Sequence, residues 1–313
     1  MPGARKRHHT LGCDETTAEA RMSEEIRSHE ETETHGAHTR EKDDAQVEKA
    51  HRPDALILHE IIRREGEEEM RRTTLALALS AFSAGLTMGF SLIVPGVLKG
   101  HLPHEPWAEL VLSIGYSVGF LIVVLGRQQL FTENTVTPIL PLLTERTFGA
   151  LMRVVRLWTI VLVANILATI LIASVLAHTD AFKPEVREAF AEISRHTVED
   201  PFWTTVIKAV FAGWLIALMV WILPATGSAA PFIIILMTWL VSMCGLAHIV
   251  AGSVDAYYLV ATGEIDFAKY LTGFFVPTLL GNVVGGVTLV SVLNFGQVAP
   301  DVEGQSPKPG SAP

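Results

Sequence analysis

The sequence predicts an all-α membrane protein with six transmembrane helices, arranged as an inverted repeat of three plus three. Charge is segregated along the chain, because residues 1–72 hold 13 of the 24 Lys and Arg and 18 of the 33 Asp and Glu. The rest of the chain contains apolar runs long enough to cross a hydrocarbon core of about 30 Å. Two of these runs are interrupted at corresponding positions, which is typical of transporters with inverted repeats and broken helices.

The N-terminal residues divide into two segments. Residues 1–52 are rich in Glu, Thr, His and Arg and cannot bury enough apolar surface to fold, so we expect a disordered acidic tail. In residues 53–72, apolar positions such as Leu58 and Ile62 precede mixed charge, which predicts an amphipathic helix. This helix lies either at the membrane surface or over a neighbouring subunit or loop. The C-terminal residues 297–313 are also expected to be disordered.

The channel domain is predicted to cover residues 73–296. Windows of about 19 residues give six spans within it. They run near Thr73–Leu98, Trp107–Gly126, Ala150–Ala177, Trp203–Leu223, Phe232–Leu259 and Tyr270–Phe295. Since each half has three spans, the two halves would have opposite topology in the membrane.

The second and fifth spans are predicted to be broken. Mostly polar residues follow Gly126 as far as Pro138, and the fifth span is interrupted around His248 to Ser253, where Gly and Ser occur. Non-helical backbone at membrane depth is tolerated only where protein or water lines it. Both breaks therefore indicate a pore or an internal site.

Matched spacings connect the two breaks. Thr132 precedes Asn165 by 33 residues, and His248 precedes Asn282 by 34. Similar steps, Ala84-Gly-Leu and Ala212-Gly-Trp, occur in the first span of each half. We expect Thr132 and His248 to meet at the pore centre, although they are 116 residues apart.

The distribution of Lys and Arg predicts the orientation, since cytoplasmic loops carry an excess of them. The basic residues are Arg63, Arg64, Arg71 and Arg72 before the first span, and Arg146, Arg153 and Arg156 around the start of the third. Both groups fall on one side of a six-span protein. We therefore expect both termini to lie in the cytoplasm. The protein itself is expected in the plasma membrane, which is the inner membrane in a bacterium. The segment Thr179–Pro201 is then expected to be an outer loop.

His248 is the main candidate for a functional residue. A titratable side chain at membrane depth is costly and usually faces a pathway or cavity. Histidine also has an unperturbed pKa near physiological pH, so its ring can exchange a proton during transport. The competing interpretation is a histidine that hydrogen-bonds between packed helices.

Several classes of function are not indicated. Cys13 and Cys244 suggest no disulfide, and the chain has no Walker loop, Cys-x-x-Cys pair or metal-ligand spacing. We expect no enzymatic activity, cofactor, metal or nucleic-acid partner.

Three segments resemble one known family. They are Gly126 to Thr137 with Leu-Phe-Thr at its centre, Gly245-Leu-Ala-His248 followed by Ala251, and Leu280-Gly-Asn-Val-Val-Gly-Gly286. Over about Asp54 to Phe295 the chain resembles the formate/nitrite transporters, most of all their YfdC-type branch. The resemblance implies an aquaporin-like protomer in a homopentamer, with one pore per protomer for small monovalent anions such as formate, nitrite or hydrosulfide, together with a proton.

The resemblance also implies roles for individual residues. Thr132 would face His248, Leu130 and Phe120 would narrow the pore on the cytoplasmic side, and Phe131 and Tyr116 would line the other constriction. Apart from the resemblance, the amides of Asn165 and Asn282 would line the pore or, as we favour, hydrogen-bond between helices. Lys208, near the start of the fourth span, would attract anions to an entrance or, as we favour, extend to the membrane interface.

Some positions depart from the family pattern. Val241 and Tyr116 stand where well-known formate channels have Phe, Gly213 where they have Asn, and Ala247 where they have an acid. The polarity around His248 is therefore altered, which leaves the anion open. Two other functions remain: a membrane scaffold or sensor without transport, and a channel for neutral small solutes.

Overall fold

The computed structural model describes residues 55–103, 105–292 and 296. The predicted tails, residues 1–52 and 297–313, lie outside the described residues. The described residues form helices and no strands, as predicted. The elements are α2 (Ala55–Arg71), α3 (Thr74–Thr87), α4 (Phe90–Lys99), α5 (Ala108–Leu125), η1 (Glu133–Thr135), α6 (Ile139–Glu145), α7 (Phe148–His178), α8 (Pro184–Thr197), α9 (Phe202–Ile222), η2 (Leu223–Ala225), η3 (Gly227–Ala229), α10 (Ala230–Met243), α11 (Ala251–Thr262), α12 (Phe267–Lys269), η4 (Tyr270–Phe275), α13 (Val276–Val283) and η5 (Val284–Val292).

Within the described residues, five helical spans are long and apolar enough to cross a membrane, and they coincide with five of the six predicted spans. They are Thr74–Lys99, Ala108–Leu125, Phe148–His178, Phe202–Ala225 and Phe267–Thr288. The remaining predicted span is divided into the half-helices α10 and α11 by residues 244–250. Residues 126–138 likewise separate α5 from the short helix α6. Both predicted breaks are therefore present.

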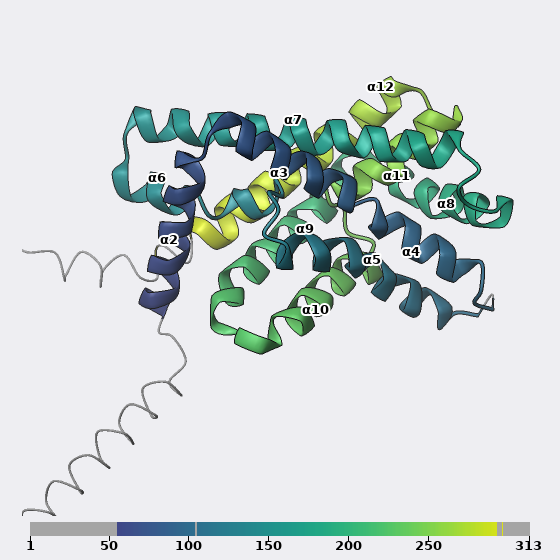
Figure 1. The fold of residues 1–313 in the computed structure, drawn as a ribbon, viewed down its shortest axis with the longest axis horizontal. Helices are drawn as coiled ribbons and strands as arrows, with labels where there is room; N and C mark the ends of the chain where they lie inside the picture. The colour runs from purple at the N-terminus through teal and green to yellow at the C-terminus, as the bar shows by residue number, and fades with distance from the viewer. Residues whose placement is uncertain (1–54, 104, 293–295, 297–313) are drawn as a thin grey trace, which may run out of the picture. The chain divides into compact units, whose positions relative to one another are not determined.

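Helices from each half pack in matching pairs. Helix α3 lies along α7, α13 lies along α9, and α5 lies along α10 (Figure 1). A Cβ atom on Gly85 of α3 would lie 2.4 Å from the backbone oxygen of Asn165, and one on Gly213 of α9 would lie 2.5 Å from the backbone oxygen of Asn282. Only glycine permits this close helix contact, which is how small residues act at helix interfaces in membranes.

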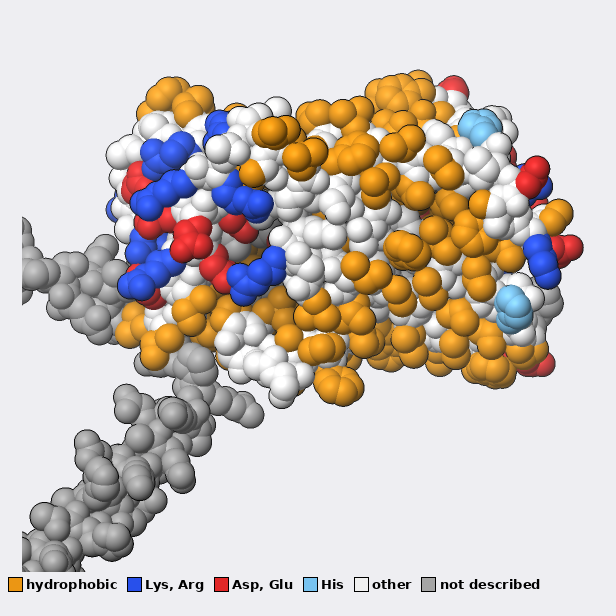
Figure 2. Space-filling view, in the orientation of Figure 1, with side chains coloured by type: hydrophobic (Ala, Val, Ile, Leu, Met, Phe, Trp, Pro, Cys, Tyr) orange, Lys and Arg blue, Asp and Glu red, His pale blue; other side chains and the backbone are white. Residues whose placement is uncertain are grey.

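The surface has the pattern of a membrane protein. Figure 2 shows charged side chains gathered towards two ends of the described unit, with mainly hydrophobic surface between them. Exposed large side chains on the spanning helices include Leu79, Leu167 and Phe211. Exposed apolar surface of this extent is suited to lipid or to another subunit.

Helix α2 packs on the helical unit. Its buried residues Ile62 and Met70 face the neighbouring helices, and α2 contacts α6, α7 and α9. A Cβ atom on Gly66 would lie 2.0 Å from the carbonyl oxygen of Thr137. Helix α2 therefore covers the end of the loop that interrupts the second span in its own chain.

The segment Thr179–Pro201 is not the plain loop that we expected. Its central residues form α8, which has Pro184 at its first turn. Its buried residues Val186 and Phe190 belong to the main core, and α8 packs on α4 and α11. The helix is short and amphipathic, so a window designed to detect membrane spans does not identify it.

Candidate functional site

The break in the second span is held in place by Asn165. The Asn165 Oδ1 accepts a hydrogen bond from the Phe131 N–H at 2.9 Å, and its Nδ2 donates to the carbonyl oxygens of Gln129 and Ala81 at 3.0 and 2.7 Å. The side chain has no exposed surface. The bonds to Phe131 and Gln129 satisfy backbone groups that the broken helix leaves without helical partners.

Asn282 holds the break in the fifth span in the same way. Its Oδ1 accepts from the Ile249 N–H at 2.8 Å, and its Nδ2 donates to the carbonyl oxygens of Ala247 and Ala209 at 2.9 and 2.8 Å. This side chain is also fully buried. Of the two interpretations of the asparagines, hydrogen bonding between elements is the observed one, and both amide N–H donors of each side chain are occupied.

Gly213, predicted as a pore residue, serves this packing. Its missing Cβ makes room for the backbone of Asn282, just as Gly85 makes room for the backbone of Asn165. A side chain at Gly213 would displace α13 and the asparagine that holds the loop of His248. The absence of an Asn at this position is therefore explained by helix contact.

Thr132 and His248 meet, as predicted. The Thr132 Oγ1 lies 2.8 Å from the His248 Nε2, and the His248 Nδ1 accepts a hydrogen bond from the Ala251 N–H at 3.2 Å. A backbone amide can only donate, so the single proton of a neutral imidazole must be on Nε2. The ring then donates to Thr132, whose own hydroxyl hydrogen is left to donate elsewhere.

Two aromatic side chains, Phe120 and Tyr116, lie in series beside the imidazole. The ring of Phe120 meets that of His248 edge to face with centroids 4.8 Å apart, and Tyr116 follows at 5.3 Å from Phe120. Phe120 and Leu130 both have 0 % exposed surface. Phe120, one of the two residues predicted to narrow the pore, therefore lies directly beside the ring of His248.

Two other predicted pore residues, Phe131 and Val241, make contacts of their own. Phe131 packs edge to face on Trp158 of α7, with ring centroids 5.9 Å apart. Val241 is fully buried near the end of α10, and its carbonyl oxygen accepts from the Leu246 N–H where the chain leaves the helix. Phe131 thus contacts the third span, whereas Tyr116 contacts Phe120.

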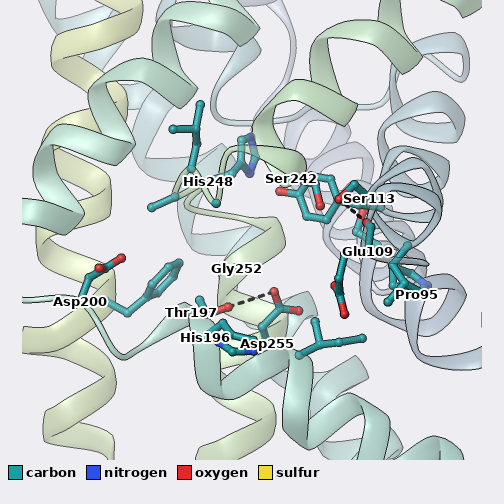
Figure 3. Close-up of a pocket in the computed structure, with 18 of the residues that line it drawn as sticks. Pro95, Glu109, Ser113, His196, Thr197, Asp200, Ser242, His248, Gly252 and Asp255 are labelled. Carbon is teal, nitrogen blue, oxygen red and sulfur yellow. Dashed lines mark hydrogen bonds between the residues drawn. The ribbon is translucent and has the colours of Figure 1, made fainter. Parts of the chain in front are cut away.

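A cavity of about 200 Å³, which we call the His248 chamber, reaches His248 from one side (Figure 3). Its lining includes Ser91, Glu109, Tyr116, Asp200, His248 and Asp255. Lys208, predicted at an entrance, forms an ion pair with Asp200 beside this chamber, with Nζ 2.5 Å from Oδ2. Its charge is therefore compensated locally.

A second cavity of about 690 Å³, the Glu69 chamber, lies under α2. The carboxylate of Glu69 accepts hydrogen bonds from Gln129 Nε2 at 3.2 Å and from Thr137 Oγ1 at 2.8 Å. Burial raises the pKa of Glu69, and the two hydrogen bonds oppose that rise. Glu133 also lines this chamber. Helix α2 thus contributes an acid that binds directly to the broken loop.

Sequence reasoning missed Asp255, Ser91 and Glu69 as site residues. Asp255 lies seven positions after His248 in the same apolar stretch, and this isolated acid is a signal that identifies it. Nothing local distinguishes Glu69 from its acidic neighbours. Within the described residues, no group of three or more His, Cys, Asp or Glu is placed to hold a metal ion.

Comparison with known proteins gives a consistent assignment. Residues 57–296 match the family model described as formate/nitrite transporter. The chain is 40 % identical over 248 residues to the inner membrane protein YfdC of Escherichia coli, covering 79 % of this chain and 80 % of that protein. It is also 24 % identical to the formate channel BtFdhC of Bacillus thuringiensis, covering 78 % of this chain and 95 % of that one.

Solved structures show the same fold. A pentameric formate channel with formate bound superimposes with a TM-score of 0.61 at 20 % identity, covering 72 % of this chain and 98 % of that one. A second channel, described as an FNT family ion channel, gives a TM-score of 0.65 at 18 % identity and covers 77 % of this chain and 98 % of that chain. With the family match over nearly the whole helical unit, the chain belongs to the formate/nitrite transporter family.

Proposed function

We propose that this protein is a transmembrane channel for small monovalent anions of weak acids, such as formate or nitrite, which pass together with a proton. The observation that carries the proposal is the buried hydrogen bond between Thr132 and His248, at the point where two broken helices meet. The relative named a formate channel supports the substrate class. The pair offers polar groups in an otherwise apolar part of the path.

The physical problem for such a channel is desolvation. A bare anion loses several kcal/mol of solvation in a low-dielectric interior, even after relaxation of its surroundings. The Thr132 hydroxyl and the backbone of the broken loops offset part of that cost. The fully buried apolar side chains of Phe120 and Leu130 favour passage in the neutral, protonated form.

Proton transfer through His248 would require a local rearrangement. Because Nδ1 accepts from the Ala251 N–H, a second proton on the ring must displace that hydrogen bond. In our proposal the Nε2–H of the ring therefore donates a hydrogen bond to Thr132 while the solute is bound. The ring takes up a second proton, on Nδ1, only when the start of α11 moves and the hydrogen bond from Ala251 is broken.

The architecture we propose is a homopentamer with one pore in each protomer, each an inverted repeat of three plus three spans. The matching contacts of Asn165 and Asn282, and of Gly85 and Gly213, support the repeat. The exposed apolar surface supports oligomerisation in the bilayer. A native mass of a monomer or dimer in mild detergent would contradict the pentamer.

We also propose that both termini are cytoplasmic in a bacterial inner membrane. Arg156 of α7 donates hydrogen bonds to the Arg72 carbonyl and to Thr74, so the basic residues before the first span lie beside those of the third. This grouping fits a single cytoplasmic side. On this assignment the His248 chamber opens outwards and the Glu69 chamber opens inwards.

The decisive experiment is a flux assay with the full chain in proteoliposomes. Formate, nitrite, hydrosulfide, acetate and lactate are compared across a pH series and with an imposed membrane potential. We expect formate or nitrite to pass, with faster flux at lower pH. Flux of none of them would favour the scaffold or sensor, and flux that ignores both pH and potential would favour a neutral-solute channel.

A further inference from the structure

Asp255 is a buried acid in the His248 chamber without a matching cation. The residue is 8 % exposed, and its carboxylate accepts a long hydrogen bond from Thr197 Oγ1, at 3.4 Å. Figure 3 shows its carboxylate beside Thr197 in the cavity that also holds His248. An acid in such a position needs a proton, a donor or a cation to compensate for its lost solvation.

The cations around the chamber are already paired with other acids. The titratable or charged groups that face it are Lys99 of α4, Glu109 and Tyr116 of α5, His196 of α8, Asp200 and His248. Lys99 pairs with Glu109 at 3.4 Å and with Glu192 at 3.0 Å, and Asp200 pairs with Lys208. Among the described residues, no Lys or Arg forms an ion pair with Asp255.

Ser91 provides a second polar group in the same chamber. Its hydroxyl is buried, has no hydrogen-bond partner in the described structure, and belongs to a residue that is 3 % exposed. The tight approach of α4 to Gly119 of α5 fixes its position, since a Cβ on Gly119 would lie 2.3 Å from Ser91 Oγ. The lining of the chamber therefore includes the carboxylate of Asp255, which accepts hydrogen bonds, and two residues with a hydroxyl, Ser91 and Tyr116.

We propose that the His248 chamber binds a small undissociated acid, whose O–H donates to Asp255 and whose remaining oxygen accepts from the hydroxyls of Ser91 and Tyr116. This inference rests on the proposed transport function and specifies the form in which the solute is taken up. Asp255 and a bound carboxylate share one proton, because two carboxylates in one site do not both stay ionised. The proton arrives with the acid from the aqueous side and moves with it towards Thr132 and His248, so no further reactant is required.

The size of the chamber agrees with this ligand. Its volume of about 200 Å³ compares with about 30 Å³ for one water molecule in the liquid, so it accommodates an acid of a few heavy atoms. The anion of a strong acid carries no proton near neutral pH. Its negative charge is therefore repelled by the charge of Asp255, and no shared proton offsets the repulsion. The chamber therefore selects weak acids against permanently charged anions.

The test is Asp255→Asn in the full chain, with Glu192→Gln as the matched control. Asn has nearly the same shape as Asp but carries no charge and cannot share the acid's proton. Glu192 is an exposed acid on the same side of the molecule, and Lys99 keeps its second partner when Glu192 is changed. Proteoliposome flux of formate and of nitrate is measured for each protein from about pH 5 to pH 8.

We expect wild-type formate flux to rise with the undissociated fraction, about tenfold for each pH unit of acidification well above the acid's pKa, and nitrate flux to be small. At neutral pH, Asp255→Asn should raise the ratio of nitrate flux to formate flux at least about tenfold, the factor that corresponds to one pKa unit. It should also flatten the dependence of formate flux on pH. Glu192→Gln should reproduce the wild type.

Four outcomes overturn the inference. If Asp255→Asn transports formate with the wild-type ratio and pH profile, the channel proposal stands and the role of Asp255 is wrong. If Glu192→Gln has the same effect as Asp255→Asn, a general surface field is responsible. An acid without a paired cation can also attract a small cation. Methylammonium flux that disappears in Asp255→Asn would therefore refute a binding site for an undissociated acid. Absence of all anion flux in the wild type overturns the channel function and this inference together.

Discussion

Replacing Thr132 with Val tests the centre of the proposed pore. Val has almost the same shape as Thr, so the change removes the hydroxyl without opening a cavity. The Nε2–H of His248 then loses its partner 2.8 Å away, in a site where both residues are 1 % exposed. A buried donor without a partner costs about 1–3 kcal/mol.

That penalty determines the expected size of the effect. At about 1.4 kcal/mol for each factor of ten, Thr132→Val should lower formate flux by about 5- to 150-fold. The loss should appear in the flux of assembled protein, because the backbone contacts of the loop do not involve the hydroxyl. Thr132→Ser is the matched control, since it keeps the hydroxyl and removes one methyl group.

The assay is stopped-flow uptake of formate into proteoliposomes that contain equal amounts of each protein, with size-exclusion chromatography to verify assembly. Thr132→Ser should retain flux within a few-fold of the wild type. Wild-type flux and pH dependence in Thr132→Val would refute the reasoning, because the hydrogen bond between the two broken helices would then have no role in transport.

Three further predictions follow from individual contacts. His248→Phe should abolish pH-dependent flux of weak acids while assembly survives. His248→Asn should keep a slow leak of the anion without pH dependence. Normal flux of His248→Phe from about pH 5 to 8 would show that the histidine is structural. Gly66→Ala should destabilise the docking of α2 by about 1–3 kcal/mol in thermal melting, because the new Cβ would lie 2.0 Å from the Thr137 oxygen. The control Gly100→Ala, whose new Cβ has its nearest contact at 3.6 Å, should leave the melting temperature unchanged. Glu69 has a raised pKa in the folded protein, so the folded state binds its proton more tightly than the unfolded chain does. Stability should therefore rise as the pH falls through the folded pKa towards the ordinary value of 4.5, and Glu69→Gln should remove that part of the pH dependence of melting without lowering stability at high pH.

The sequence by itself determined the membrane class, the positions of the spans and the two breaks. Long apolar runs can be recognised one window at a time, because the bilayer sets a minimum length that does not depend on the neighbouring helices. The breaks were recognisable for a related reason, since polar residues such as Thr132 and His248 are costly at membrane depth and must be compensated. Their nearly equal spacing to Asn165 and Asn282 was sufficient to predict that Thr132 and His248 meet.

Only the tertiary structure decided what compensates each polar group. The sequence does not distinguish an asparagine that lines a pore from one that holds a loop, because the difference lies in which backbone groups from distant spans reach its amide. The same holds for Gly213, whose role depends on the approach of α13, and for Asp255, whose lack of a cation follows from the pairing of Lys99 and Lys208 with other acids. Helix length and burial are properties of a local segment, whereas hydrogen-bond and charge compensation arise from contacts between segments that are far apart in the chain.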